Sequence, residues 1–98
     1  MPELEEEVLV VIRRVFSTEL GFAGAVDPAH DLLRDLHVDS LNAVILAVGL
    51  EDHFRVSLSA EDTVGVTTVA SLMTLVAERV RAVRAADARG DADAMGDA

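Results

Sequence analysis

Hydrophobic residues recur at helical spacing along two stretches of the chain, and this pattern predicts two amphipathic helices. The first covers residues 4–16, and the last lies within residues 67–85, with Thr67 or Thr68 as its N-cap. The apolar side of the first helix carries Leu4, Val8, Val11, Ile12, Val15 and Phe16. The apolar side of the last helix carries Val69, Leu72, Met73, Val76, Val80 and Val83. Stripes of this kind pack against a common core.

Residues 40–54 also have helical spacing, but their apolar side chains fall on two sides of the helix. At about 100° per residue, the group with the larger side chains forms one side that suits the core: Leu46, Leu50 and Phe54. Nearly opposite lie Leu41, Val44, Ile45 and Val48. A central helix can be apolar all round, whereas an exposed apolar patch bordered by acids is typical of a docking surface. Glu51 and Asp52 at the end of the helix favour a docking surface.

The segments between these helices complete the predicted fold. Residues 21–39 form a long connection, with a turn at Asp27-Pro28, and its Leu32, Leu33 and Leu36 are expected to pack onto the core. Residues 60–65 are expected to form one short helical turn with Ser59 as its N-cap. The predicted fold is therefore all-α: a four-helix bundle with three longer helices, one short helix and a long loop between helices 1 and 2.

Length and composition predict one folded domain over residues 1–86. Residues 87–98 contain small residues with four Asp and one Arg, so they bury little area and are expected to be a disordered acidic tail. The formal net charge of -10 disfavours nucleic acid and anionic membranes as partners. It favours proteins with basic surfaces.

The absence of cysteine excludes a disulfide, a thiolate nucleophile and a Cys-ligated zinc site. The three histidines His30, His37 and His53 lack the spacing of a metal site. No apolar run is long enough to cross a bilayer, and the acidic N-terminus differs from a signal peptide. These features predict a cytoplasmic protein without a metal.

Asp39 and Ser40 stand at the predicted start of the second helix. Both residue types are favoured N-caps. A helix N-terminus also stabilises an attached phosphate, because its N–H groups are free and carry partial positive charge. Ser40 is therefore a candidate N-cap and a candidate site for a phosphate ester.

The segment "DLHVDSLNAVILAVGLEDHF", residues 35–54, resembles the signature of acyl carrier proteins, in which Asp-Ser-Leu opens the second helix. The segment "FRVSLSAEDTVGVTTVASLMTLV" keeps the spacing of that family to the last helix, so the resemblance covers roughly residues 4–84. It implies that Ser40 carries 4'-phosphopantetheine, transferred from coenzyme A by a phosphopantetheinyl transferase. The protein is then a carrier and not an enzyme, and it holds acyl groups as thioesters on the thiol of that arm.

The resemblance also implies a recognition surface. Asp39 and Leu41 help the transferase to recognise the site, and Val44 and Val48 face partner enzymes such as an acyltransferase or a ketosynthase. Acidic contacts to basic partners are expected from Glu51, Asp52, Glu61 and Asp62. A monomer is the expectation for this family.

The chain departs from the family pattern at three positions near this surface. His37 replaces the usual glycine, and Asn42 and Ile45 occupy positions that are commonly acidic. The recognition surface, in which we include Ile45, is thus more apolar than in carriers of fatty-acid synthesis. This difference predicts a free-standing carrier of a specialised pathway such as polyketide biosynthesis.

Three alternatives remain open from the sequence. An aminoacyl or peptidyl carrier of a nonribosomal pathway shares the chemistry, although "HVDSL" is closer to the acyl type. An unmodified helical module that binds a partner through Val44 and Val48 needs no modification of Ser40. A hydrolase using Ser40, His37 and Asp39 is disfavoured, because neighbouring residues cannot easily adopt triad geometry.

Overall fold

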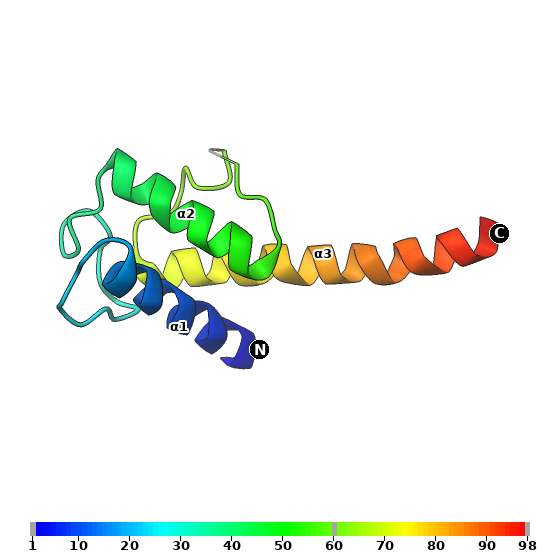
Figure 1. Ribbon diagram of the computed structural model, residues 1–98, viewed down its shortest axis with the longest axis horizontal. Helices are drawn as coiled ribbons and strands as arrows, with labels where there is room; N and C mark the ends of the chain where they lie inside the picture. Colours follow the sequence, from blue (N-terminus) through cyan, green and yellow to red (C-terminus); the bar gives the residue numbers. More distant parts are fainter. Residues whose placement is uncertain (1, 60, 98) are drawn as a thin grey trace.

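The computed structural model describes residues 2–59 and 61–97, and it describes side chains for residues 3–59 and 61–86. It contains three helices: α1 (Pro2–Thr18), α2 (Ser40–Phe54) and α3 (Val69–Asp97). Within the described ranges there is no strand, only an isolated bridge between Asp31 and Thr68. Figure 1 shows α1 and α2 beside the first half of α3, while the rest of α3 extends beyond them. The all-α prediction is confirmed, as are the bounds of the second helix.

The core lies where α1 packs against both α2 and α3. The whole predicted stripe of α1 is buried, and Val8 and Ile12 are 0% exposed. From α2, Leu46 and Leu50 are buried, and Phe54 packs against the core at its edge. The predicted stripe of α3 is buried from Val69 to Val80, with Val83 partly buried. The hydrophobic pattern therefore identifies the core side of each helix correctly.

The long connection between α1 and α2 is present, but one of its three predicted core residues is exposed. Leu36 is buried and Leu32 is partly buried, whereas Leu33 is 66% exposed. The cause is a turn centred on Asp31, whose Oδ1 accepts hydrogen bonds from the N–H groups of Leu33 at 3.0 Å and Arg34 at 2.8 Å. In this turn Leu33 lies on the solvent side, so the prediction for Leu33 was wrong.

The fourth, short helix is not confirmed. Ser59 and Asp62 do form a reciprocal pair of hydrogen bonds, in which each backbone N–H donates to the side chain of the other at 3.0 and 3.1 Å. The described residues that follow, 61–65, form only turns. Thr63 and Val64 are β-branched and Gly65 is the least restrained residue type, so this segment has low helix propensity. The structure therefore has three described helices rather than four.

Both ends of α3 can be compared with the predictions for the last helix and the tail. Thr68 and Ser71 cap its start, because the N–H of Ser71 donates to Thr68 Oγ1 at 3.1 Å and that of Thr68 to Ser71 Oγ at 3.0 Å. At the other end, the backbone of α3 continues as helix to Asp97, where the sequence predicted an unstructured tail. Alanine is frequent there and is the strongest helix former. Side chains beyond residue 86 lie outside the described ones, so a separate tail remains a prediction.

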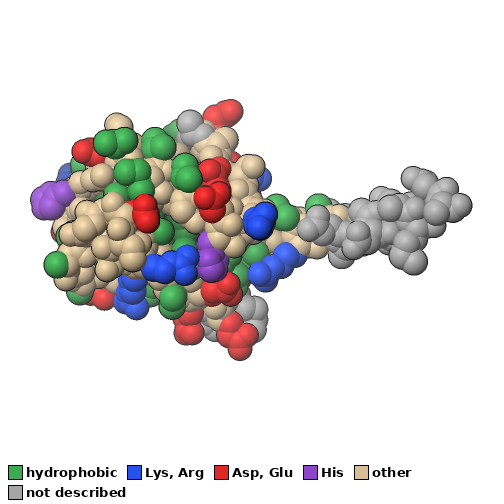
Figure 2. All heavy atoms as spheres, in the orientation of Figure 1, with side chains coloured by type: hydrophobic (Ala, Val, Ile, Leu, Met, Phe, Trp, Pro, Cys, Tyr) green, Lys and Arg blue, Asp and Glu red, His purple; other side chains and the backbone are tan. Residues whose placement is uncertain are grey.

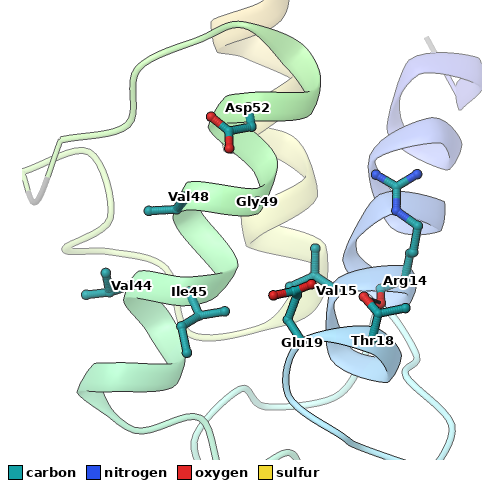
Figure 3. Close-up of a pocket in the computed structure, with 9 residues that line it drawn as sticks. All are labelled: Arg14, Val15, Thr18, Glu19, Val44, Ile45, Val48, Gly49 and Asp52. Carbon is teal, nitrogen blue, oxygen red and sulfur yellow. Dashed lines mark hydrogen bonds between the residues drawn. The ribbon is translucent and has the colours of Figure 1, made fainter.

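Gly49 of α2 lies in a tight contact with Val15 of α1 (Figure 3). A Cβ atom built on Gly49 would lie 2.8 Å from Val15 Cγ2. Val15 is buried and its branched side chain has one strongly preferred rotamer in a helix. A larger residue at position 49 therefore forces the two helices apart.

We expect Gly49→Ala to lower the free energy of unfolding by about 1–3 kcal/mol, the usual cost of overpacking. In a helix interior without this contact, the same change would stabilise by roughly 0.5–1 kcal/mol. Denaturant unfolding of Gly49→Ala in the wild-type and Val15→Ala backgrounds measures the contact. The destabilisation by alanine at position 49 should disappear when Val15 is truncated. An unchanged loss in both backgrounds would contradict the proposed contact.

Candidate functional site

Asp39, not Ser40, caps the N-terminus of α2. Asp39 has extended backbone angles (φ -89°, ψ -173°), and its Oδ1 accepts a hydrogen bond from the N–H of Asn42 at 2.8 Å. Its carbonyl oxygen accepts from the N–H of Ala43, also at 2.8 Å. This arrangement satisfies one of the N–H groups that every helix start leaves without an intrahelical partner.

Ser40 is the first residue of α2 and its side chain is exposed. Its hydroxyl makes no hydrogen bond to any residue that the structure describes. The hydroxyl is therefore accessible, and it lies at the positive end of the helix dipole. Esterification there places a phosphate beside a helix N-terminus, which stabilises negative charge. The position fits a phosphate ester.

His37 and Arg55 flank α2 and are the two non-glycine residues with positive φ among those described, at 56° and 57°. In this left-handed region glycine has no steric penalty, and most other residues are strained. The backbone around His37 is held by two hydrogen bonds, from its N–H to Leu33 O at 3.1 Å and from the N–H of Val38 to Leu32 O at 2.8 Å. The backbone at position 37 thus favours the glycine that this chain lacks.

The second apolar side of α2 is exposed. Leu41 is 68% exposed, Val44 59% and Val48 47%. Ile45 is half-buried and packs against the core. Figure 2 shows hydrophobic side chains gathered over α2, with acidic side chains beside them. The alternative that α2 is a central helix buried on all sides is therefore wrong. We call Leu41, Val44 and Val48 the outer stripe.

Two of the four acidic residues predicted to face partners are bonded within the chain. Glu51 Oε2 accepts a hydrogen bond from the N–H of Leu58 at 2.7 Å. Asp62 Oδ2 accepts from Arg79 at 2.8 Å. Hydrogen bonds from the backbone and hydroxyl of Ser59, and then the Arg79 charge, hold the pKa of Asp62 below its ordinary value. Asp52 and Glu61 are exposed.

Glu51 and Asp62 therefore have a structural role that the sequence did not indicate. Each bonds to the segment that follows α2: Glu51 at Leu58, and Asp62 within that segment and to α3. Their carboxylates hold this segment against the C-terminal end of α2 and against α3. Spacing alone does not reveal such bonds, because the partners are backbone N–H groups and a residue 17 positions away.

Two hollows flank α2. A groove of about 450 Å³ lies between α1 and α2, with Gly49 at its floor (Figure 3). A smaller cavity of about 170 Å³ lies on the other side, between α2, the segment after it and α3. Its lining is apolar apart from Thr63, and it includes Ala43 and Ala47 of α2. None of the described helices combines the length and the continuous hydrophobicity that crossing a bilayer requires.

Comparison with known proteins identifies the class of this site. A family model described as "Phosphopantetheine attachment site" matches residues 10–76. Domains of this kind are carriers rather than catalysts, and phosphopantetheine is their cofactor. Over 77 residues the chain is 30% identical to the meromycolate extension acyl carrier proteins of Mycobacterium tuberculosis and Mycobacterium leprae, covering 78% of this chain and 67% of each relative. The chain therefore belongs to the acyl carrier protein family, which confirms the resemblance and the cofactor predicted from the sequence.

The capping geometry separates the roles of two neighbouring residues. We expect Asp39→Ala to lower the free energy of unfolding by about 1 kcal/mol, because it removes the cap of α2. We expect Ser40→Ala to change it by no more than about 0.5 kcal/mol, because the Ser40 side chain makes no described bond. Denaturant unfolding of both variants gives the comparison. A larger loss for Ser40→Ala than for Asp39→Ala would show that Ser40 is the cap.

Proposed function

We propose that Ser40 is the attachment point of phosphopantetheine and that the protein carries acyl intermediates between the enzymes of a biosynthetic pathway. The observation that carries this proposal is that Asp39 and Ser40 have different roles at the start of α2. Asp39 caps the helix, so the exposed hydroxyl of Ser40 is not needed as the N-cap. Ser40 also lies inside the segment that matches the attachment-site family.

The residues around Ser40 favour its modification. In the transfer by a phosphopantetheinyl transferase, Ser40 Oγ bonds to the phosphorus next to the pantetheine and the pyrophosphate bond of coenzyme A breaks. Adenosine 3',5'-bisphosphate leaves, and the transferase accepts the hydroxyl proton. The N-terminus of α2 stabilises the charge of the resulting phosphodiester. Asp39 holds this turn of the helix in place, and the exposed Leu41 offers an apolar contact beside the serine. When attached, the arm supplies the thiol that holds acyl groups as thioesters.

The outer stripe and the exposed acids form the proposed docking surface. Val44 and Val48 provide exposed apolar contact area along α2, and Asp52 and Glu61 attract basic partner surfaces. Charge of this kind mainly raises the association rate and sets orientation. Glu51 and Asp62 contribute to the negative field, but their bonds within the chain make direct partner contacts secondary for them.

We infer a specialised pathway, such as polyketide biosynthesis, from the apolar character of this surface. Ile45 and Asn42 stand where carriers of fatty-acid synthesis commonly have acids, so enzymes that recognise those acids should bind this chain weakly. A second candidate is a role in meromycolate extension. The names of the mycobacterial relatives, which denote meromycolate extension, favour that candidate.

Intact mass spectrometry tests the central proposal. After incubation with coenzyme A, magnesium and a broad-specificity phosphopantetheinyl transferase, we expect a gain equal to one phosphopantetheine arm. Ser40→Ala should remain unmodified while keeping its fold. No gain with several transferases in a folded wild-type protein would overturn the proposal and favour an unmodified interaction module. Loading by an amino-acid-adenylating partner would instead favour the aminoacyl carrier.

The Ile45→Glu variant tests the inferred specialisation. Adding an acid at the recognition surface should raise kcat/KM for malonyl transfer by a fatty-acid synthase transacylase by about tenfold, or ~1.4 kcal/mol. Val10→Glu controls for the added charge alone, because Val10 is exposed on α1 and lies outside the recognition surface. Efficient transfer to the wild-type carrier, with no gain in Ile45→Glu, would contradict a specialised surface.

A further inference from the structure

The α1–α2 groove lies beside the outer stripe and has a mixed lining. In Figure 3, Ile45 projects from α2 toward α1, and Val15 and Glu19 project from α1 toward α2. Val44 and Val48 also line the groove, and in Figure 3 their side chains point away from α1. Glu19, Asp52 and Arg14 also line it, and Arg14 Nη2 lies 3.2 Å from His53 Nδ1. The groove therefore offers an apolar floor together with hydrogen-bond acceptors and donors.

Both hollows beside α2 can be reached from Ser40. Val44, one turn after Ser40 and about 6 Å along the axis, lines the groove, and Ala43 lines the smaller cavity. Asp52, at the far end of the groove, lies about 18 Å along the axis from Ser40. A flexible chain attached at Ser40 can thus follow the groove along the length of α2.

The chemistry of the phosphopantetheine arm matches the groove better than the cavity. The arm contains amide groups and a geminal dimethyl group. Burying an amide in the smaller, apolar cavity leaves it without hydrogen-bond partners, which is unfavourable. In the groove, Glu19 and Asp52 can accept from amide N–H groups, and Arg14 can donate to a carbonyl oxygen. Thr18 Oγ1 already donates to Arg14 O at 2.8 Å and keeps its capacity to accept.

We propose that the α1–α2 groove is the resting site of the phosphopantetheine arm. This inference rests on the proposed attachment at Ser40. Ile45, Val44 and Val48 contact the apolar part of the arm, and Glu19 and Asp52 accept its amide hydrogens. Val44 and Val48 also belong to the outer stripe, so an enzyme that covers the stripe displaces the arm from the groove. Docking and release of the arm are therefore coupled through the same two side chains.

The chain contains no cysteine, so the thiol of the arm is the only thiol in the modified protein. A nitroxide attached to that thiol broadens the NMR signals of nearby backbone amides. In the modified protein we expect loss of the amide signals of Thr18, Glu19 and Gly49. The signals of Leu58 and Val66, which line the smaller cavity, should persist. The reduced nitroxide provides the reference spectrum.

Matched variants make the test specific to the groove. Thr18→Tyr fills the groove and should restore the lost signals, whereas Thr74→Tyr, at an exposed threonine of α3, should leave the pattern unchanged. Glu19→Ala removes one acceptor without adding bulk and should restore part of the lost signals. It therefore keeps the test valid if Thr18→Tyr fails to fold.

Two outcomes would overturn the inference while leaving the proposed function intact. Broadening confined to the residues around Ser40 would mean that the arm is solvated. Broadening at Leu58 and Val66 would mean that the arm enters the smaller cavity. Failure of the proposed function gives a different result, because an unmodified Ser40 yields no mass gain and no labelled thiol.

Discussion

The packing of α1 against both other helices is the constraint on which the rest of the structure depends. Its entire apolar stripe is buried, and the contact with α2 is close enough that only glycine fits opposite Val15. Because α1 covers one side of α2 and α3 lies beside the core residues Leu46 and Leu50, the described structure has no further element to cover the outer side of α2. The exposed outer stripe therefore follows from the number of helices and from the tightness of the α1–α2 contact.

The start of α2 shows how local structure makes a residue available for chemistry. Asp39 takes the capping role, and the turn before it requires a left-handed backbone at His37. These features together fix where α2 begins and leave Ser40 as an exposed residue of its first turn. Histidine at position 37 keeps the same backbone conformation that glycine would adopt, with more strain. The turn is held by hydrogen bonds from backbone N–H groups to Leu32 and Leu33.

Periodicity predicts the helices and their core sides well, because each stripe arises from local geometry. The same pattern could not decide whether the outer stripe of α2 was buried, since that depends on whether another helix covers it. The prediction that Leu33 packs onto the core was wrong, because Asp31 accepts hydrogen bonds from the backbone and the resulting turn places Leu33 on the solvent side. The core residues Val26 and Val56 were missed because they are in loops, where no repeating pattern marks burial.

The contacts of candidate site residues are harder to predict than their positions. Family resemblance indicated Ser40, its cofactor and the acidic residues, but it did not reveal that Glu51 and Asp62 bond within the chain. Carboxylates near α2 look alike in sequence, and their partners are decided by the path of the segment after the helix. The close contact at Gly49 was also missed, because a glycine within a helix indicates close approach only when the neighbouring helix is known.

Ile45 connects the packing constraint to partner choice. Its side chain projects toward α1 and packs against the core, so it supports the same α1–α2 contact that leaves the outer stripe exposed. A glutamate at this position would hold its charge next to the apolar side chains between the helices, or turn it outward at a loss of packing. The apolar residue therefore stabilises the helix pair while it removes an acid that partner enzymes could recognise. In this chain, the surface offered to partners is determined in part by how α1 and α2 pack.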